Sequence, residues 1–360
     1  MRSGTRSIIV GTGSHVPERN VRNDDFLQHE FYDSDGDPLQ RPAAEVIEKF
    51  AKITGILERR WVADNVVTSD IAALAAEDAL NTSGVDPESL DHVIVAHNFG
   101  DVRVDNRSSD FVPSLAARVK ARLGIRSPGA VCYDIPFGCP GWLQGLIQAH
   151  CFLTAGHGRR ALVIGAETLS RVSDPHDRDS MIYADGAGAV VLESIDTDEP
   201  VGILGHAARS DTLEHAHLLS MGRSYNPGCE DRGLFLKMRG HKLYEYALRT
   251  LPQVIQDALE RGGVVLEDVK KVLLHQANAK MDEAIVRRLC KLCGIETVAS
   301  EVVPMTVSWL GNSSVATLPT LLDLLQKGQL SSSALASGDL ALFASVGAGM
   351  NANAMMYRVP

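Results

Sequence analysis

Apolar runs alternate with helical patterns along the chain, and one such arrangement occurs twice. A helical pattern ends at Asp78-Ala79-Leu80, and after a short loop the apolar segment DHVIVAHN follows. A second helical pattern ends 179 positions later, at Asp257-Ala258-Leu259, and the apolar segment KKVLLHQAN follows it. Short, continuous apolar runs are typical of strands that are buried on both faces. Each block therefore predicts a helix, a short loop and a buried parallel strand.

A second correspondence supports an internal duplication of this 360-residue chain. The apolar segment ALVIGAE begins at Ala161, and the similar segment ALFASVG begins 180 positions later, at Ala341. Two correspondences at about half the chain length predict an α/β fold made of two similar halves, residues 1–200 and 201–360. Each half should be a mixed sheet with helices on both faces, and the active site is expected where the halves meet.

Two segments interrupt these patterns. Residues 206–240 show no sustained period, and irregular stretches of this length in an enzyme are often flaps over the substrate. We therefore predict a flap there. Residues 28–48 begin with a polar stretch and are expected on the surface.

The composition narrows the class of protein. A net charge of −10 argues against nucleic acid as a partner, because nucleic-acid binding needs a basic surface. No stretch reaches the ~20 apolar residues of a membrane-spanning helix, and the first residues do not resemble a signal peptide, so we expect a cytoplasmic protein without a membrane partner. Six cysteines in so long a chain do not indicate a disulfide framework. Cys290 and Cys293 lie in a helical pattern without the second pair of a zinc site, so no metal site is predicted.

The segment AVCYDIPFGCPGWLQGLIQAH carries the candidate nucleophile. It predicts a strand, a turn and a helix, with Cys139 at the N-terminus of the helix. The positive end of the helix dipole favours a thiolate there, and Gly138 and Gly141 would leave room for a substrate beside the sulfur. The alternative is that Cys139 is one more small buried residue. That alternative suits Cys132, in the strand, and Cys151, in the helix interior, better than it suits Cys139.

Two polar residues of the second half complete the candidate site. His275 ends the buried strand of KKVLLHQAN, and α/β proteins place active groups at the carboxyl ends of strands. Asn312 precedes a predicted helix in VSWLGNSSVATL, at the place in the second half that corresponds to Cys139. Each has an ordinary alternative, because a lone histidine is more often structural and an asparagine before a helix can be an N-cap. A cysteine-protease triad would use the same three residue types, but its layout does not match a duplicated chain with a mid-chain cysteine.

These motifs, in this order, resemble the β-ketoacyl-acyl-carrier-protein synthase III family of the thiolase superfamily. The resemblance extends nearly end to end through IIVGTGSHVPE, TGILERRWV, FGCPGW, ETLSRVSDPHDRDSMIYADGAGAVVLE, LHQAN, LGNSSVATLPTLL and SVGAGM. It implies a thiolase-like fold, in which the two duplicated α/β halves form a five-layered αβαβα core. It also implies a homodimer.

The resemblance implies a reaction as well. Cys139 would carry the acyl group as a thioester, and the backbone N–H groups of Cys139 and Gly347 would form the oxyanion hole. His275 and Asn312 would donate hydrogen bonds to the malonyl thioester oxygen while CO2 leaves, and the resulting carbanion would attack the acyl-cysteine. The substrates would be an acyl-CoA or acyl-acyl-carrier protein and malonyl-acyl-carrier protein, in fatty-acid initiation. No metal or organic cofactor is expected.

The binding residues follow the family less closely. Arg178 in DPHDRDS matches a position near the coenzyme, Asn278 is a second candidate for substrate binding, and Lys280 replaces an arginine that docks the acidic carrier protein. Typical members carry a Trp and an Arg that grip the coenzyme A nucleotide where this chain has Lys49 and Ile53. FGCPGW also replaces the usual ACAGF. These departures leave open a priming or condensing ketosynthase of a specialised lipid or polyketide pathway.

The same residues distinguish the proposed reaction from three other functions. Acyl transfer without carbon–carbon bond formation would keep Cys139 and His275 but would not need Asn312. A non-catalytic partner subunit would be expected to lack Cys139. A biosynthetic thiolase would carry another reactive cysteine near the C-terminus, and no cysteine follows Cys293.

Overall fold

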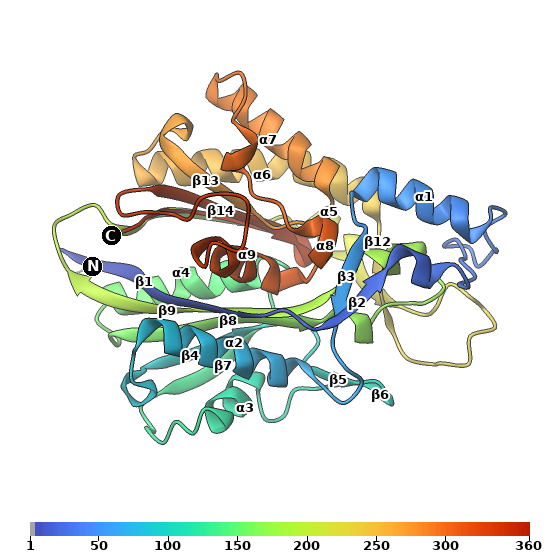
Figure 1. Cartoon of the computed structure of the whole chain (residues 1–360), viewed down its shortest axis with the longest axis horizontal. Helices are drawn as coiled ribbons and strands as arrows, with labels where there is room; N and C mark the ends of the chain where they lie inside the picture. The colour runs from blue at the N-terminus through green and yellow to red at the C-terminus, as the bar shows by residue number, and fades with distance from the viewer. Residues whose placement is uncertain (1–3) are drawn as a thin grey trace.

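The computed structural model describes residues 4–360, which form five layers (Figure 1). The layers are α6 (Gly240–Gly262) with α7 (Ala279–Cys293), a four-stranded sheet, α4 (Gly141–Thr154) with α9 (Thr317–Gln326), a five-stranded sheet, and α2 (Thr68–Ser83) with α3 (Leu115–Arg122). This order of layers is the predicted αβαβα core of the thiolase-like fold.

Each half of the chain builds one mixed sheet. The first has the order β1 (Thr5–His15), β9 (Asp185–Asp196), β8 (Arg160–Thr168), β4 (His92–Ala96) and β7 (Val131–Ile135). The second has the order β10 (Gly202–Ser210), β15 (Asn351–Arg358), β14 (Leu340–Gly347) and β13 (Val269–Leu274). The pairs β4–β7, β4–β8 and β13–β14 are parallel, and the other pairs are antiparallel. The chain passes from one sheet to the other between residues 196 and 202.

The duplicated blocks of the sequence fold alike. Helices α2 and α6 end at Gly84 and Gly263, whose φ angles of 64° and 63° lie in the left-handed region that glycine adopts without strain. A single 3₁₀ turn follows each helix, at Pro87–Ser89 and at Leu266–Asp268, and then comes β4 or β13. The predicted series of helix, loop and buried strand is therefore confirmed in both halves.

The central helix layer is packed from both halves and holds the sheets together. Trp142 and Leu146 of α4, Leu321 of α9 and Phe343 of β14 belong to one buried apolar cluster and are almost inaccessible to solvent. Burying a large apolar side chain stabilises a fold by roughly 1.5–3 kcal/mol. The cluster therefore fixes the start of α4 and the segment before α9 relative to each other, and these are the places where the candidate residues lie.

Short elements lie around this core. They are the two-stranded sheets β2 (Arg19–Arg22) with β3 (Glu58–Trp61), β5 (Asp101–Arg103) with β6 (Asn106–Asp110) and β11 (Leu219–Gly222) with β12 (Phe235–Met238), and the helices α1 (Ala43–Thr54), α5 (Thr212–His215) and α8 (Val307–Leu310).

The prediction that residues 206–240 lack regular structure was largely wrong. β10 continues to Ser210, α5 follows, and β11 pairs with β12, which leaves only 223–234 irregular. The strands of this region are short, so their period-two pattern is too brief to stand out. Residues 28–42 do form a loop, but Phe31 within it is buried.

Residues 4–360 contain neither a candidate membrane-spanning helix nor a candidate metal-binding cluster. Across residues 4–360, no helix has both the length and the apolar character needed to cross a membrane. Within the same range, no cluster of three or more His, Cys, Asp or Glu side chains is arranged to hold a metal ion. Cys290 and Cys293 lie on α7 as the helical pattern predicted.

Candidate active site

Cys139 lies between the first sheet and the central helix layer. β7 ends at Ile135, a turn follows, and α4 begins at Gly141 with Pro140 as its N-cap residue. The Gly141 N–H group donates to the Gly138 carbonyl group at 2.9 Å and closes the turn around the cysteine. Within residues 4–360 no backbone carbonyl group accepts from the backbone N–H group of Cys139. The predicted order of strand, turn, cysteine and helix is confirmed.

The glycines around Cys139 lie in close contact with other parts of the fold, and room for a substrate beside the sulfur stays a prediction. Gly138 has a φ of 69°, and a Cβ atom on it would lie 2.7 Å from the Ala348 nitrogen. A Cβ atom on Gly347 would lie 2.6 Å from the Cys139 nitrogen. The backbone at 347–348, from the second half, therefore lies directly against the turn that carries Cys139. This contact is consistent with Gly347 as a member of the oxyanion hole, which stays a prediction.

His275 directly follows β13 and is buried at the edge of the second sheet. Its backbone N–H group donates to the Ala344 carbonyl group of β14 at 2.9 Å. The adjacent Gln276 accepts from the backbone N–H groups of Thr306 and Val307 at 2.8 and 3.0 Å. Gln276 thus ties the strand of His275 to the loop and helix that lead to Asn312.

Asn312 follows α8 and lies against the first half of the chain. Its N–H group donates to the Ile182 carbonyl group at 3.0 Å, and its carbonyl group accepts from the Ala184 N–H group at 2.8 Å. Its side-chain oxygen accepts from the Ser314 N–H group at 2.8 Å. Because that oxygen is occupied, the side chain presents its Nδ2 group as the remaining donor, which is the polarity that the predicted role requires.

Ser314 joins the three predicted residues. Its hydroxyl group donates to the Cys139 sulfur at 3.4 Å, its N–H group donates to the Asn312 side-chain oxygen, and its backbone lies beside the His275 imidazole. Its φ of 54° is unusual for a residue other than glycine, and such strain is often found at functional sites. The structure therefore brings Cys139, His275 and Asn312 together around one residue that sequence reasoning missed. The signal was present in the motif GNSS, which we interpreted only through its asparagine.

The surroundings shift the acidities of both titratable residues. Burial raises the pKa of the Cys139 thiol to about 11, although the Ser314 hydroxyl group acts in the opposite direction. Burial of the sulfur therefore acts against the thiolate that the helix N-terminus is expected to favour. Burial also lowers the pKa of His275 to about 4, so the imidazole is neutral at pH 7 and can donate one hydrogen bond. Its Nδ1 atom is buried without a partner among the described residues.

Two further polar residues behind the nucleophile were not predicted. Asn98, just after β4, accepts from the Gly138 N–H group at 2.8 Å and donates to the Glu167 carboxylate at 2.7 Å. Glu167 is fully buried near the end of β8, and burial raises its pKa to about 7. Neither residue had a sequence signal beyond its place at the end of an apolar strand.

The predicted binding residues lie farther out. Arg178 is exposed in a 3₁₀ turn, and Lys280 is exposed on α7. Asn278 caps α7, since its side-chain oxygen accepts from the Met281 N–H group at 3.2 Å. That cap gives Asn278 a structural function, and contact with substrate stays a prediction for all three. Lys49 and Ile53 lie on α1 and are exposed.

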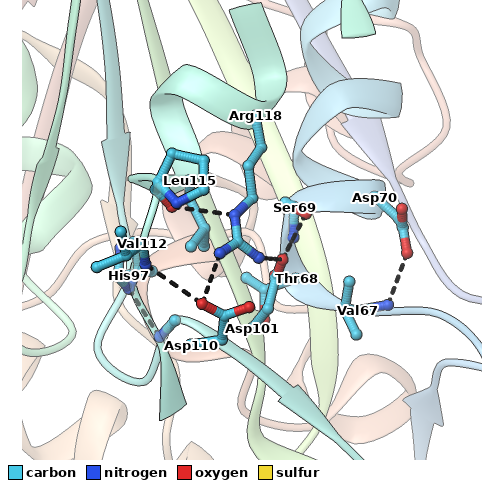
Figure 2. A network of polar contacts seen from close by, with 12 residues as sticks. Val67, Thr68, Ser69, Asp70, His97, Asp101, Asp110, Val112, Leu115 and Arg118 are labelled. Atoms are coloured by element: carbon cyan, nitrogen blue, oxygen red, sulfur yellow. Dashed lines mark hydrogen bonds and ion pairs between the residues drawn. The ribbon is translucent and has the colours of Figure 1, made fainter. Parts of the chain in front are cut away.

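An ion-pair network anchors the loop beyond Asn98 (Figure 2). Arg118 of α3 pairs with Asp101 at 2.6 Å and with Asp110 at 2.7 Å, which are the first and last residues of the β5–β6 hairpin. Asp101 also accepts from the Ser69 N–H and hydroxyl groups, both at 2.7 Å. The hairpin is thereby fixed to α2 and α3, whereas Val112, just beyond it, is 85% exposed.

The five-layered fold, with a cysteine before the central helix and a histidine and an asparagine from the second half of the chain, defines a thiolase-fold condensing enzyme. The profile of 3-oxoacyl-[acyl-carrier-protein (ACP)] synthase III matches residues 133–212, and the profile of its C-terminal part matches residues 259–359. The chain belongs to the 3-oxoacyl-[acyl-carrier-protein] synthase III family.

Solved structures agree with this membership. The β-ketoacyl-[acyl carrier protein] synthase III of Thermus thermophilus is 31% identical, with a TM-score of 0.79 over 98% of this chain and 99% of that one. The 3-oxoacyl-[acyl-carrier-protein] synthase III of Aquifex aeolicus is 29% identical, with a TM-score of 0.77 over 99% and 100%. The priming β-ketosynthase of the R1128 polyketide biosynthetic pathway is 26% identical, with a TM-score of 0.78 over 100% and 98%.

Proposed function

We propose that the protein joins an acyl group to a malonyl unit by decarboxylating condensation, with Cys139 as the nucleophile and malonyl-acyl-carrier protein as the extender. The observation that carries this proposal is the convergence of Cys139, His275 and Asn312 around Ser314. Fatty-acid initiation is the proposed setting, as the names of the synthase III relatives suggest.

The first half-reaction transfers the acyl group to the enzyme. The Cys139 sulfur attacks the thioester carbonyl carbon, and the N–H groups of Cys139 and Gly347 stabilise the oxyanion that forms. The carbon–sulfur bond to coenzyme A or carrier protein then breaks, and the departing thiolate takes the proton that the Cys139 thiol released. Because burial raises the pKa of Cys139 to about 11, the sulfur holds its proton at pH 7 before the acyl donor binds.

The second half-reaction forms the carbon–carbon bond. The carboxylate of the malonyl group leaves as CO2, and its bonding electrons pass into an enolate whose oxygen accepts hydrogen bonds from His275 and Asn312. The enolate carbon attacks the acyl-cysteine carbonyl carbon, and the Cys139 sulfur leaves as a thiolate. The product is a 3-oxoacyl thioester. A neutral His275 suits this role because it donates a hydrogen bond without giving up a proton.

The assembly proposed for the protein is a homodimer. β7 is an edge strand of the five-stranded sheet, and Val131 at its start is 55% exposed. Phe111 and Val112 add exposed apolar surface beside the β5–β6 hairpin. An open strand edge near apolar surface favours pairing with a second copy. Light scattering after size exclusion gives the mass that tests this assembly.

A priming or condensing ketosynthase of a specialised pathway is the second candidate. Similarity to the priming β-ketosynthase of the R1128 pathway supports it, and so do the exposed Lys49 and Ile53 where typical family members grip the coenzyme. The two candidates share the reaction and differ in the acyl group.

Intact-protein mass spectrometry tests the reaction and identifies the primer. Wild type and Cys139→Ala are incubated with a panel of acyl-CoAs and acyl-carrier proteins, and malonyl-acyl-carrier protein is then added. We expect a mass gain in wild type only, discharged as a 3-oxoacyl product. An adduct that malonyl-acyl-carrier protein does not discharge would favour acyl transfer without condensation, and no adduct with any donor would refute the enzymatic proposal.

A further inference from the structure

Both the oxygen and the nitrogen of the Asn98 amide group form hydrogen bonds within the site. Its oxygen accepts from the Gly138 N–H group at 2.8 Å, and its nitrogen donates to the Glu167 carboxylate at 2.7 Å and to the Ser314 hydroxyl group at 3.3 Å. Its backbone N–H group donates to the same carboxylate oxygen at 3.0 Å. Asn98 thus contacts the turn of the nucleophile and the loop that carries the second half's donors.

These bonds have a fixed direction. The Gly138 N–H group can only donate, so the side-chain oxygen of Asn98 must face it and the NH2 group must face Glu167 and Ser314. The Ser314 hydroxyl group accepts from Asn98, and its own proton is left to point at the Cys139 sulfur, 3.4 Å away. A series of hydrogen bonds therefore runs from the buried carboxylate through Asn98 and Ser314 to the sulfur.

We propose that Asn98 is a positioning residue of the condensing reaction: anchored by Glu167, it orients the Ser314 hydroxyl group so that this group stabilises the Cys139 thiolate. This inference rests on the proposed role of Cys139. Asn98 also holds the turn at Gly138, so that one side chain sets both the place of the sulfur and the donor that faces it. The predicted active residues explain neither Glu167 nor Asn98.

Glu167 makes the network sensitive to pH. One of its oxygens has no partner within the described residues, and the other accepts both bonds from Asn98. Burial and, to a smaller extent, Asp185 of β9 raise its pKa, whereas His97 and the two hydrogen bonds from Asn98 lower it, and the resulting pKa is about 7. Above pH 7 the Glu167 carboxylate is charged, and its charge disfavours a thiolate nearby. The same carboxylate accordingly raises the pKa of Cys139. The reactivity of the sulfur should therefore respond to pH near 7 as well as to its own ionisation.

The test is the rate at which iodoacetamide alkylates Cys139, followed between pH 6 and 10 by peptide mass spectrometry. Ser314→Ala and Asn98→Ala should each slow alkylation about tenfold at every pH below the thiol's midpoint, because losing a hydrogen bond to a charged group raises its pKa by about one unit. Glu167→Gln should remove the bend near pH 7 that wild type shows. Asn20→Ala, on the exposed strand β2, is the control and should match wild type.

Each outcome decides the proposal. Unchanged alkylation in both Ser314→Ala and Asn98→Ala, with thermal unfolding shifted in Asn98→Ala, would show a purely structural role and overturn it. If Asn98→Ala does not fold, Ser314→Ala and Glu167→Gln still carry the test, because each removes a single step of the series. Failure of the proposed function looks different: wild type would then form no acyl adduct at Cys139 with any donor. Steady-state kinetics should show a lower kcat with little change in KM for both alanine variants.

Discussion

The Ser314 hydroxyl group donates to the Cys139 sulfur across 175 positions of sequence and from the opposite half of the chain. The first half supplies the nucleophile and the second half supplies its hydrogen-bond donor, together with His275 and Asn312. Neither sheet alone therefore contains a complete site. The buried cluster around α4 and α9 fixes this relationship, since both segments belong to it.

Replacing His275 should separate the two half-reactions. In His275→Ala the enolate loses one of its two donors, and the condensation rate should fall about 10²–10³-fold. Acyl transfer to Cys139 should persist, because the proposed oxyanion hole for that step is made of backbone groups. The measurement is the acyl adduct by mass spectrometry beside the rate of 3-oxoacyl product. His241→Ala, exposed on α6, is the matched control, and equal losses in both half-reactions would contradict the assigned role.

A methyl group at position 347 should disturb the site directly. Gly347→Ala places its Cβ atom 2.6 Å from the Cys139 nitrogen, so one of the two segments must move. We expect a loss of about 1–3 kcal/mol in the free energy of unfolding, by urea titration, and a loss of acylation. Gly129→Ala is the control, because the nearest atom to its new Cβ atom would be 3.6 Å away. Full stability and activity in Gly347→Ala would contradict this close contact between the two segments.

The low pKa of His275 predicts a stability that depends on pH. The pKa is about 4 in the folded protein and ~6.5 in the unfolded chain, so the histidine is neutral in both states above pH 6.5. As the pH falls from 6.5 towards 4, only the unfolded chain takes up the proton, and the free energy of unfolding should drop by up to about 3 kcal/mol. His275→Asn should lack this part of the drop. Urea unfolding of both proteins at pH 7 and pH 4.5 measures the difference, and parallel pH profiles would refute the burial argument.

The hydroxyl group of Tyr183 offers a fourth test. It is buried without a partner among residues 4–360, and its residue bridges to Asn312. An unpaired buried hydroxyl group is costly, so Tyr183→Phe should raise the free energy of unfolding by roughly 1 kcal/mol. A stability gain with an altered preference among acyl donors would show that this group faces the substrate. Lower stability in Tyr183→Phe would mean that the hydroxyl group is bonded after all.

The fold was predictable where the sequence repeats itself. The paired blocks ending at Leu80 and Leu259 indicated two similar halves because buried strands and their preceding helices leave long, clear patterns. The three residues around Ser314 were predictable because each ends or follows such an element. The short strands β11 and β12 gave no pattern of sufficient length.

The polar surroundings of the site were not predictable in the same way. Asn98 contacts both Gly138 and Glu167 only because three strands pack side by side. No spacing along the sequence indicates these contacts. The effect of burial on the pKa of Cys139 was not predictable for a related reason. A helix N-terminus is visible in the sequence, whereas the depth of burial is a property of the whole fold.

The contact between the backbone of Gly347 and Cys139 also limits how such a site can evolve. A side chain at Gly138 or Gly347 would collide with the backbone of the other segment, so neither glycine can be replaced, whatever acyl group the enzyme uses. New preferences must arise in residues that surround the acyl chain or the carrier. As acyl preference diversifies, the reacting centre would then stay unaltered and the surrounding residues would change.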